Sequence, residues 1–371
     1  MLPATLIVNN RVFTFSQLTD GIAEVELSSL SAYERSTLDC CRRWLTGQQQ
    51  FVLPTSGSTG QPKAIVIDRA QLAASARLTG KALGLKAGDR ALVCVSTEYV
   101  AGLMMLVRGF ELGLALTINA PSRNPLALLP PESRFDFTAM APLQLQEILN
   151  ATPEKKAILD RMRAIIIGGA PVSEALQAQV GAIEAPLFHT YGMTETVSHI
   201  ALRRLNGPQA SDWFQPLEGV TLGLDRRGCL TVASVLTRRQ TLVTNDRVEL
   251  RPDGSFRWLG RLDNVINSGG VKVQAEQVET AVGRLFQDYR NGLLARRRFF
   301  VAPQEDPALG QAVTLVMEGT PLAPALQFDI RQKLRQQGLL TKYEIPRYFQ
   351  FKAKFVETPT GKIDRRANWG G

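Results

Sequence analysis

The stretch Ala164-Ile165-Ile166-Ile167-Gly168-Gly169-Ala170-Pro171 places four apolar residues directly before a Gly-Gly turn. Such an apolar run is typical of a buried strand in an α/β sheet, and ligands of open α/β sheets bind at the edge where the strands end. Two glycines at that edge allow a flat ring to lie close to the backbone. An ordinary strand-to-helix turn has the same pattern, so this stretch alone leaves both interpretations open.

Short apolar runs and longer amphipathic segments alternate over the first two-thirds of the chain. This alternation predicts an α/β domain with a largely buried sheet. We expect a further helix to begin at Pro153, with Thr152 as its N-cap residue. The other elements predicted here are strands at 91–95, 115–118 and 164–167, and helices at 70–83 and 143–150.

The pattern changes from Ala201 onward, where strand-sized pieces lie close together. Turn signals at 225–228 and 251–254 indicate a β-rich subdomain. Near Leu262-Asp263 we place a boundary between a large N-terminal domain at 1–261 and a smaller α+β domain at 262–371. In the smaller domain we expect helices at 274–289 and 323–336 and strands at 299–302, 312–317 and 347–351.

Composition narrows the classes of protein that the chain can belong to. It has 371 residues, four cysteines, two histidines and a formal charge of +9. The cysteines form no C-x-x-C pair, so a zinc site and a disulfide framework are not expected. We find no signal peptide and no apolar stretch of membrane-spanning length, and with reduced thiols this predicts a cytoplasmic protein. The basic pairs are scattered, which indicates a solvated surface or attraction of anionic ligands rather than a nucleic-acid binder.

Two further stretches carry groups that suit a nucleotide. Pro54-Thr55-Ser56-Gly57-Ser58-Thr59-Gly60-Gln61-Pro62-Lys63 combines hydroxyls, flexible glycines and a cation that can surround phosphate oxygens. It lacks Walker A spacing, and a flexible Ser/Gly linker is the alternative. Thr190-Tyr191-Gly192-Met193-Thr194-Glu195-Thr196 offers an aromatic face for a base, a hydroxyl for a phosphate and a carboxylate for Mg²⁺.

With three more motifs, these stretches resemble the adenylate-forming superfamily of acyl-CoA synthetases, luciferases and peptide-synthetase adenylation domains. Thr244-Asn245-Asp246 is similar to the ribose-binding aspartate motif of that superfamily. The stretch 260–266, followed by Gly269-Gly270, looks like its hinge, and 358–366 is similar to its C-terminal lysine motif. The motifs follow the family order. An α/β domain with sheets and packed helices, plus a smaller α+β domain, is the fold that the resemblance implies.

The resemblance also implies roles for residues. Tyr191 would pack against adenine, Asp246 would accept hydrogen bonds from the ribose, and Glu195 would hold Mg²⁺. Lys362 would offset the charge that grows at the reacting centre in the first half-reaction, after which the small domain would rotate about Asp263. The catalytic residues implied are Thr194, Glu195 and Lys362. The ATP-binding residues implied are Thr55, Ser56, Gly57, Ser58, Thr59, Gly60, Lys63, Gly168, Gly169, Ala170, Tyr191, Gly192, Asp246 and Arg261.

The chain departs from the family pattern without losing a catalytic group. Ala64 stands where the family usually has glycine, and Asn245 precedes the ribose aspartate where a smaller residue is commoner. The resemblance begins close to the N-terminus, so we expect a shortened N-terminal domain.

The stretches 96–109 and 191–199 are similar to those of compact o-succinylbenzoate–CoA ligases of menaquinone biosynthesis. The acid pocket would then use Tyr99, Gly102, Arg108, Ser198 and His199. A second substrate carboxylate would suit an arginine or a histidine. For Arg108 a surface position is the alternative, for His199 a buried structural role, and for Met104 and Met105 core packing is favoured.

These observations predict a ligase that activates a carboxylic acid with ATP and Mg²⁺ and passes it to coenzyme A, with o-succinylbenzoate as the best specific acid. Another aryl or acyl acid, or a carrier-protein thiol, is the near alternative. A non-catalytic nucleotide-binding regulatory protein is the alternative from another class, and the intact Lys63, Glu195, Asp246 and Lys362 argue against it. No nucleic-acid partner is expected, and a homodimer is left open.

Overall fold

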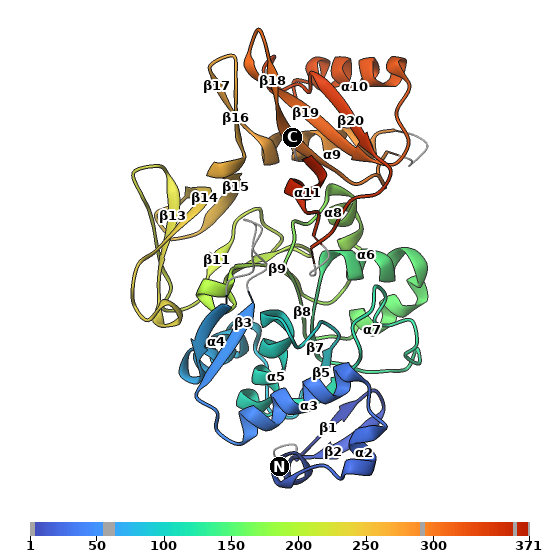
Figure 1. Cartoon of the computed structure of the whole chain (residues 1–371), viewed down its shortest axis with the longest axis vertical. Coiled ribbons are helices and arrows are strands. Elements are labelled where there is room, and N and C mark those ends of the chain that lie inside the picture. Colours follow the sequence, from blue (N-terminus) through green and yellow to red (C-terminus); the bar gives the residue numbers. More distant parts are fainter. Residues whose placement is uncertain (1–3, 55–63, 290–293, 359–361, 370–371) are drawn as a thin grey trace.

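The computed structural model describes residues 4–54, 64–289, 294–358 and 362–369. The predicted phosphate-binding residues Thr55, Ser56, Gly57, Ser58, Thr59, Gly60 and Lys63 lie outside these ranges. In the described part, a large mixed sheet carries helices on both faces, and smaller sheets follow toward the C-terminus (Figure 1). No helix in that part is long and apolar enough to cross a membrane.

The large sheet has nine strands in the order β11-β10-β9-β8-β7-β5-β6-β1-β2. The strands from β1 to β9 along this order pair in parallel, and antiparallel β2 and β10–β11 extend the two ends. The bounds are β1 Thr5–Val8, β2 Arg11–Thr14, β5 Arg90–Val93, β6 Ala115–Ile118, β7 Phe137–Met140, β8 Ala164–Ile167, β9 Leu187–Gly192, β10 His199–Arg204 and β11 Gln215–Pro216.

Strand β8 shows why the central strands read as continuous apolar runs. Ala164 and Ile166 belong to one core, whereas Ile165 and Ile167 point into a second core on the opposite face. Each face therefore needs apolar side chains. The first core includes residues of α3 (Ala32–Leu45), α4 (Arg69–Leu83) and α5 (Val100–Leu112), and the second includes residues of α6 (Pro142–Ala151), α7 (Lys156–Asp160) and α8 (Glu174–Val180). Two short helices, α1 (Phe15–Asp20) and α2 (Glu24–Ser28), precede α3.

Two smaller β units adjoin the first core. The ribbon of β3 (Gln50–Pro54) and β4 (Ala64–Asp68) buries Phe51 and Ile67 against that core, while Val52 and Val66 on its other face are exposed. The second unit is a four-stranded antiparallel sheet, with turns at the two places that the sequence predicts. Its strands are β12 Thr221–Leu224, β13 Cys229–Ala233, β14 Leu242–Leu250 and β15 Phe256–Arg261.

The 3-10 turn η4 (Leu262–Asn264) leads from β15 into a five-stranded sheet with its own apolar core. At the junction with the large sheet, Arg284 of α9 forms an ion pair with Glu174 of α8 at 3.4 Å. The division into domains at 261/262 stays a prediction, although η4 lies at that point. The elements are β16 Val265–Ser268, β17 Val271–Gln274, α9 Ala275–Gln287, β18 Phe299–Asp306, β19 Gly310–Glu318, α10 Pro324–Gln336, β20 Tyr348–Lys352 and α11 Arg365–Trp369.

Most predicted elements agree with the structure to within a few residues, and the predicted start at Pro153 with Thr152 in the N-cap position is confirmed. The expected helix begins as the 3-10 turn η1 (Pro153–Lys155) before α7. Thr152 does not cap it through its side chain, because its hydroxyl donates to the Ile148 carbonyl at 3.2 Å and accepts from Asn124 at 2.9 Å. The hydroxyl is therefore used by the end of α6 and by the neighbouring loop.

Candidate active site

The Gly-Gly turn after β8 is set by close packing against β9. A Cβ atom on Gly168 would lie 2.1 Å from Oγ1 of Thr190, whose hydroxyl donates to the Ile167 carbonyl at 3.2 Å. Gly169 has φ +82°, in the left-handed region that favours glycine. Backbone geometry alone therefore requires both glycines. Together with Ala170 they form a thin wall at the edge where β8 ends.

Tyr191 and Asp246 face each other at the end of β9. The Tyr191 hydroxyl donates to Oδ2 of Asp246 at 2.6 Å. The ring lies edge-on to Phe256 and Phe214, with centroids 5.0 and 5.9 Å away. Burial, reinforced by the Asp246 carboxylate, raises the pKa of Tyr191 well above its usual range, so the phenol remains a donor at neutral pH. The predicted adenine-packing and ribose-binding residues therefore form one unit.

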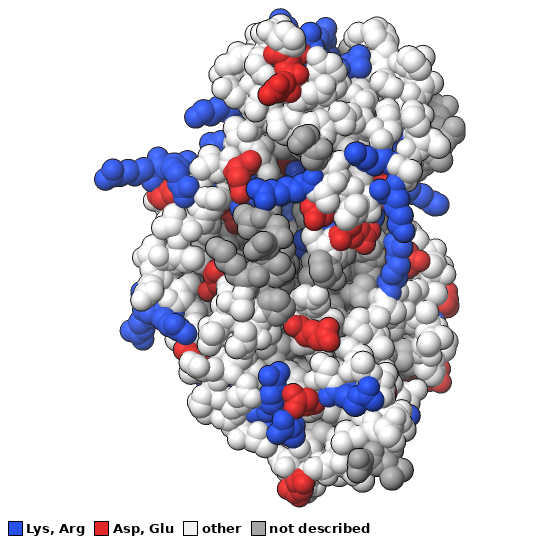
Figure 2. Space-filling model, viewed as in Figure 1, with Lys and Arg blue, Asp and Glu red and all other residues white. Residues whose placement is uncertain are grey.

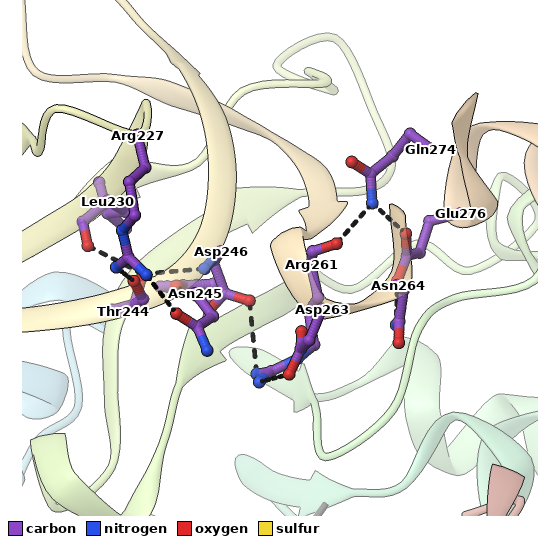
Figure 3. A network of polar contacts seen from close by, with 11 residues as sticks. Arg227, Leu230, Thr244, Asn245, Asp246, Arg261, Asp263, Asn264, Gln274 and Glu276 are labelled. Carbon is purple, nitrogen blue, oxygen red and sulfur yellow. Dashed lines mark hydrogen bonds and ion pairs between the residues drawn. The ribbon is translucent and has the colours of Figure 1, made fainter. Parts of the chain in front are cut away.

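Arg261 connects this unit to the predicted hinge (Figure 3). It ends β15 directly opposite Asp246 on β14. Its Nε and Nη2 atoms donate to the two carboxylate oxygens of Asp263 at 2.9 and 2.7 Å, while Nη1 lies 3.8 Å from Oδ1 of Asp246. The hydrogen bonds that Arg261 donates to Asp263 raise the pKa of Arg261. Burial alone would raise the pKa of Asp263, but Arg261 outweighs it and holds that pKa below its usual range.

Hydrogen bonds to neighbouring residues fix the strand segment that precedes Asp246. The Thr244 hydroxyl donates to the Leu230 carbonyl at 2.8 Å and accepts from the Asp246 N–H at 3.0 Å. Asn245, which departs from the family pattern, accepts from Nη1 of Arg227 at 3.0 Å, and Nη2 of the same arginine donates to the Thr244 carbonyl at 2.9 Å (Figure 3). The larger side chain at 245 thus has a partner and leaves Asp246 free to face the site.

Lys362 lies at the same site. Its N–H donates to the Thr358 hydroxyl at 3.2 Å, and its carbonyl accepts from the Thr358 N–H at 2.7 Å, so it stands at the base of a tight hairpin. Burial, followed by the positive charge of Arg261, lowers the pKa of Lys362. Two cations, Lys362 and Arg261, thus lie near each other, which is an arrangement suited to an anionic ligand.

Thr194 and Glu195 belong to the 3-10 turn η2 (Thr194–Thr196) between β9 and β10. Gly192 permits the chain to reverse here, because a Cβ atom would lie 2.3 Å from the Ser198 carbonyl oxygen. Glu195 is exposed, and no cluster of three or more metal-ligating side chains occurs among the described residues. This fits Mg²⁺ bound mainly through nucleotide phosphates with one protein carboxylate, which is a common arrangement for that ion.

The predicted acid pocket brings together Arg108, Ser198 and His199. Arg108 is only 2% exposed, which excludes the alternative of a surface position. Its Nη2 donates to the Ser198 hydroxyl at 3.0 Å, its Nε has no hydrogen-bond partner, and among the described residues it forms no ion pair. Burial lowers the pKa of Arg108 to about 9, so the group remains charged at neutral pH.

His199 is buried beside this guanidinium, and the hydrogen-bond network fixes its tautomer. The Thr79 hydroxyl donates to the Ser75 carbonyl at 3.0 Å, so it accepts from Nε2 of His199 at 3.2 Å. Nδ1 is then the unprotonated nitrogen, and it lies 3.5 Å from the Ser198 hydroxyl. Burial, and then the charge of Arg108, lower the pKa of His199 well below 6.5. The imidazole is neutral, so among the described residues Arg108, Ser198 and His199 only the arginine carries a charge.

Gly102 and Tyr99 lie at the N-terminal end of α5. A Cβ atom on Gly102 would lie 2.2 Å from the Ser96 carbonyl oxygen, so glycine allows the first turn of α5 to pack on the loop before it. Tyr99 is half-buried at the N-cap position of that helix. Met104 and Met105 are fully buried core residues, as the sequence favoured.

Sequence reasoning missed the roles of Thr79, Gln274 and Glu276. Gln274 donates to the Arg261 carbonyl at 2.8 Å and to Glu276 at 2.5 Å, and Glu276 also accepts from Asn264 at 2.5 Å (Figure 3). These contacts fasten η4 to the start of α9. Nothing local in the sequence marks these three residues, because each acts on a partner in another element.

Basic and acidic side chains are interspersed over the face shown in Figure 2. Basic residues gather into no single patch among the residues described on that face. This agrees with the scattered basic pairs of the sequence and contrasts with the basic face typical of nucleic-acid binders.

Comparison with known proteins adds to this geometry. Residues 47–220 match the model of the AMP-binding enzyme family. An acyl-CoA synthetase (AMP-forming)/AMP-acid ligase II-like protein from Dyadobacter fermentans is 45% identical in a match covering 91% of this chain and 94% of that chain, with a TM-score of 0.60. A 2-succinylbenzoate–CoA ligase from Lactococcus lactis is 23% identical over 96% of this chain and 79% of its own length.

The o-succinylbenzoate coenzyme A synthetase of Bacillus subtilis, solved with ATP and a magnesium ion, shares the fold. It is 21% identical and superposes with a TM-score of 0.69 over 85% of this chain and 69% of its own. The fold is thus that of adenylate-forming enzymes. The chain belongs to the AMP-binding enzyme family, among the AMP-forming acyl-CoA synthetases and ligases.

Proposed function

We propose that the chain activates a dicarboxylic aryl acid, o-succinylbenzoate, with ATP and transfers it to coenzyme A, a reaction of menaquinone biosynthesis. The observation that carries the choice of acid is the buried Arg108, which is charged and has no counter-ion among the described residues. An unpaired buried charge is costly, so an anionic partner is expected in the working complex.

Among the side chains that the structure describes, no carboxylate forms an ion pair with Arg108. Residues 1–3, 55–63, 290–293, 359–361 and 370–371 contain no aspartate or glutamate. Ser198 and His199, both neutral, do not supply a negative charge either. A second carboxylate on the substrate supplies one and allows the bidentate geometry that guanidinium groups favour.

The nucleotide would lie between the wall formed by Gly168, Gly169 and Ala170 and the Tyr191–Asp246 unit. Asp246 and Arg261 would contact the ribose. Residues 55–63, with Lys63, would surround the phosphates, and Thr194 would add a hydroxyl. Mg²⁺ on Glu195 would offset phosphate charge. These assignments follow the family resemblance and the convergence of the described residues on one edge of the sheet.

In the first half-reaction a substrate carboxylate oxygen attacks the α-phosphorus of ATP, and pyrophosphate leaves. Lys362 would stabilise the charge that develops between the carboxylate and the α-phosphate. In the second, the thiolate of coenzyme A attacks the acyl carbonyl and AMP leaves. Lys362 is not needed in that step, and the small domain would rotate about Asp263 to admit the thiol.

The first test is pyrophosphate release with ATP, Mg²⁺ and o-succinylbenzoate, followed by mass spectrometry of the product formed with coenzyme A. Two mono-acids are matched controls: 4-oxo-4-phenylbutanoate lacks the ring carboxylate, and 2-butanoylbenzoate lacks the succinyl one. We expect turnover of the diacid and poor turnover of both mono-acids. Equal turnover of a mono-acid would refute the choice of substrate, and product formed only on a carrier-protein thiol would refute the choice of acceptor.

Lys362→Ala tests the mechanism separately. We expect adenylation to fall by roughly 10²–10³-fold, the loss seen when one preorganised electrostatic group is removed. Thioester formation from supplied acyl-adenylate should change little. An equal fall in both half-reactions would contradict the assignment of Lys362 to the first step alone.

A further inference from the structure

Lys362 is held in place by a short hairpin. One side of the hairpin is Val356–Thr358 and the other begins at Lys362, with a bridge between Glu357 and Ile363. The Asp364 N–H donates to the Val356 carbonyl at 3.0 Å. Asn368 of α11 closes the base, because it accepts from the Val356 N–H at 2.9 Å and donates to the Asp364 carbonyl at 2.6 Å. The hairpin therefore moves as one piece with the start of α11.

One carboxylate ties this piece to the rest of the small domain. Glu279 of α9 accepts from Nη2 of Arg365 at 2.8 Å through one oxygen and from the Val301 N–H at 2.7 Å through the other. Arg365 is the first residue of α11, and its guanidinium lies 5.7 Å from the centroid of the Phe300 ring. Helix α9, strand β18 and the lysine hairpin thus meet at Glu279.

The surroundings of this ion pair make it rigid. Only 18% of the Glu279 side chain is exposed. Burial raises the pKa of Glu279, and the positive charge of Arg365 opposes that rise. Beside it, Phe300 and Phe355 form a small buried cluster on which Ile363 packs. A carboxylate that is hydrogen-bonded on both oxygens in such a place fixes the geometry of its partners more firmly than an exposed pair does.

Arg365 follows Lys362 by three residues, which is roughly 10 Å of extended chain. A shift of the Arg365 anchor is therefore passed to the lysine along a short, hydrogen-bonded segment. Because catalysis by a charged group depends on placement to within about an ångström, even a small shift lowers the rate. We propose that Glu279 is a positioning residue for adenylation: through Arg365 it holds the hairpin that presents Lys362 to the reacting centre. This inference rests on the proposed function.

The test compares Glu279→Gln and Arg365→Gln with a matched control in the same domain. Asp306 has a fully buried side chain paired with Arg347 at 3.0 Å and with the Tyr348 hydroxyl at 2.7 Å. It lies five residues from Val301 along β18, roughly 16 Å away. Asp306→Asn therefore removes another arginine-paired carboxylate of the same domain, one that is more buried than Glu279 and does not touch the lysine hairpin.

We expect Glu279→Gln and Arg365→Gln to lower the adenylation rate by roughly 10- to 100-fold, with thioester formation from supplied acyl-adenylate changed by less than about twofold. Asp306→Asn should lower the melting temperature without changing the ratio of the two half-reactions. If Glu279→Gln does not fold, Arg365→Lys takes its place, with a smaller loss confined to adenylation. Equal losses in both half-reactions, or an unchanged ratio in folded variants, would overturn the inference.

Hydrogen exchange separates this inference from the proposed function. The amides of Thr358 and Asp364 are both hydrogen-bonded inside the hairpin. They should exchange faster in Glu279→Gln than in the wild type, and at wild-type rates in Asp306→Asn, whether or not an acid is turned over. If no acid releases pyrophosphate but exchange rises as expected, the proposed function fails and the anchor stands. Unchanged exchange in folded Glu279→Gln overturns the anchor even in an active enzyme.

Discussion

Two arginines at the site, Arg108 and Arg261, have opposite surroundings. Arg108 is 2% exposed, donates to the neutral Ser198 and has no carboxylate beside it among the described residues. The Arg261 side chain is 33% exposed and lies between two carboxylates, those of Asp246 and Asp263. Among the described residues, the first is a charge held in the protein interior without a counter-ion, and the second is a charge shared between two carboxylates near solvent.

The difference shows which arginine can select a ligand and which can connect moving parts. A buried cation without a counter-ion favours an anionic ligand over a neutral one. The free energy gained when the two charges pair therefore contributes to the selection of the ligand. A half-exposed pair contributes little to stability, and water can replace its contacts when the chain moves. Arg108 therefore suits the proposed acid pocket, and Arg261 suits the proposed hinge.

Replacing Arg108 should have the largest effect. We expect Arg108→Met to lower kcat/KM for o-succinylbenzoate by roughly 10²–10³-fold, because the second carboxylate loses its buried partner. The same change should leave the melting temperature unchanged or higher, since a thioether of similar length replaces an unpaired buried charge. Steady-state kinetics and a thermal unfolding scan measure both.

Arg108→Lys serves as the control for charge without planar geometry, and it should recover only part of the activity. The mono-acid controls sharpen the result, since the acid that lacks the carboxylate facing position 108 should lose little in Arg108→Met. A comparable loss with both mono-acids, or a marked fall in stability, would show that Arg108 is a structural residue.

The second-largest effect is expected from pH, because acid should lower the free energy of unfolding through His199, which lies beside Arg108. His199 is neutral in the folded state because burial, and then Arg108, lower its pKa well below 6.5. Below pH 6.5, His199 binds a proton in the unfolded chain but stays unprotonated in the folded chain. The free energy of unfolding is therefore highest above pH 6.5 and falls as the pH drops below it. The expected slope is about 1.4 kcal/mol per pH unit. Urea unfolding at pH 7, 6 and 5 measures it.

The chain makes this measurement clean, because it has only two histidines. His199→Gln removes one titrating group, and the difference between the two proteins isolates His199 from the carboxylates. His189 adds a fall of its own in both proteins, since burial and then the charge of Arg203 lower its pKa to about 3. Identical pH profiles for wild type and His199→Gln would contradict a neutral, buried His199.

The sequence could predict those structural features that depend on residues close together in the chain, and it could not predict those that depend on distant residues. The bounds of β6 and β8 were predicted as observed. A strand that is covered on both faces needs apolar side chains at successive positions, so its sequence is a continuous apolar run. Strands β9 and β10, which lie toward one end of the large sheet, were not predicted as strands. Their sequences include His189, Thr190 and Arg203, because side chains there line the site and a charged neighbourhood instead of a core.

The site shows the same limit. Motif residues such as Tyr191, Asp246 and Lys362 could be named from the sequence. The direct pairing of Tyr191 with Asp246 joins residues 55 positions apart, and the Thr79–His199 contact joins residues 120 apart. Whether Arg108 is buried was also undecided in the sequence, because burial depends on what covers that face of α5. Such facts arise only when distant elements pack.

The smallest effect is expected at the hinge pair. Asp263→Asn removes a bidentate ion pair whose side chains are 33% and 44% exposed. Exposed pairs contribute roughly 0.2–1 kcal/mol, and salt screens them over about 3 Å at 1 M. We therefore expect a loss of unfolding free energy below about 1 kcal/mol that disappears in 1 M NaCl. Thermal unfolding at low and high salt measures it.

Glu249→Gln is the matched control, because it breaks the similarly exposed pair with Arg257 on the same sheet without touching the site. Both variants should respond to salt alike in stability, while only Asp263→Asn should alter the half-reaction that follows rotation of the small domain. A loss above about 2 kcal/mol that persists in 1 M salt would contradict the comparison. It would mean that the Arg261–Asp263 ion pair stabilises the folded chain as strongly as a buried pair does. Such a strong pair beside η4 would oppose rotation of the small domain rather than permit it.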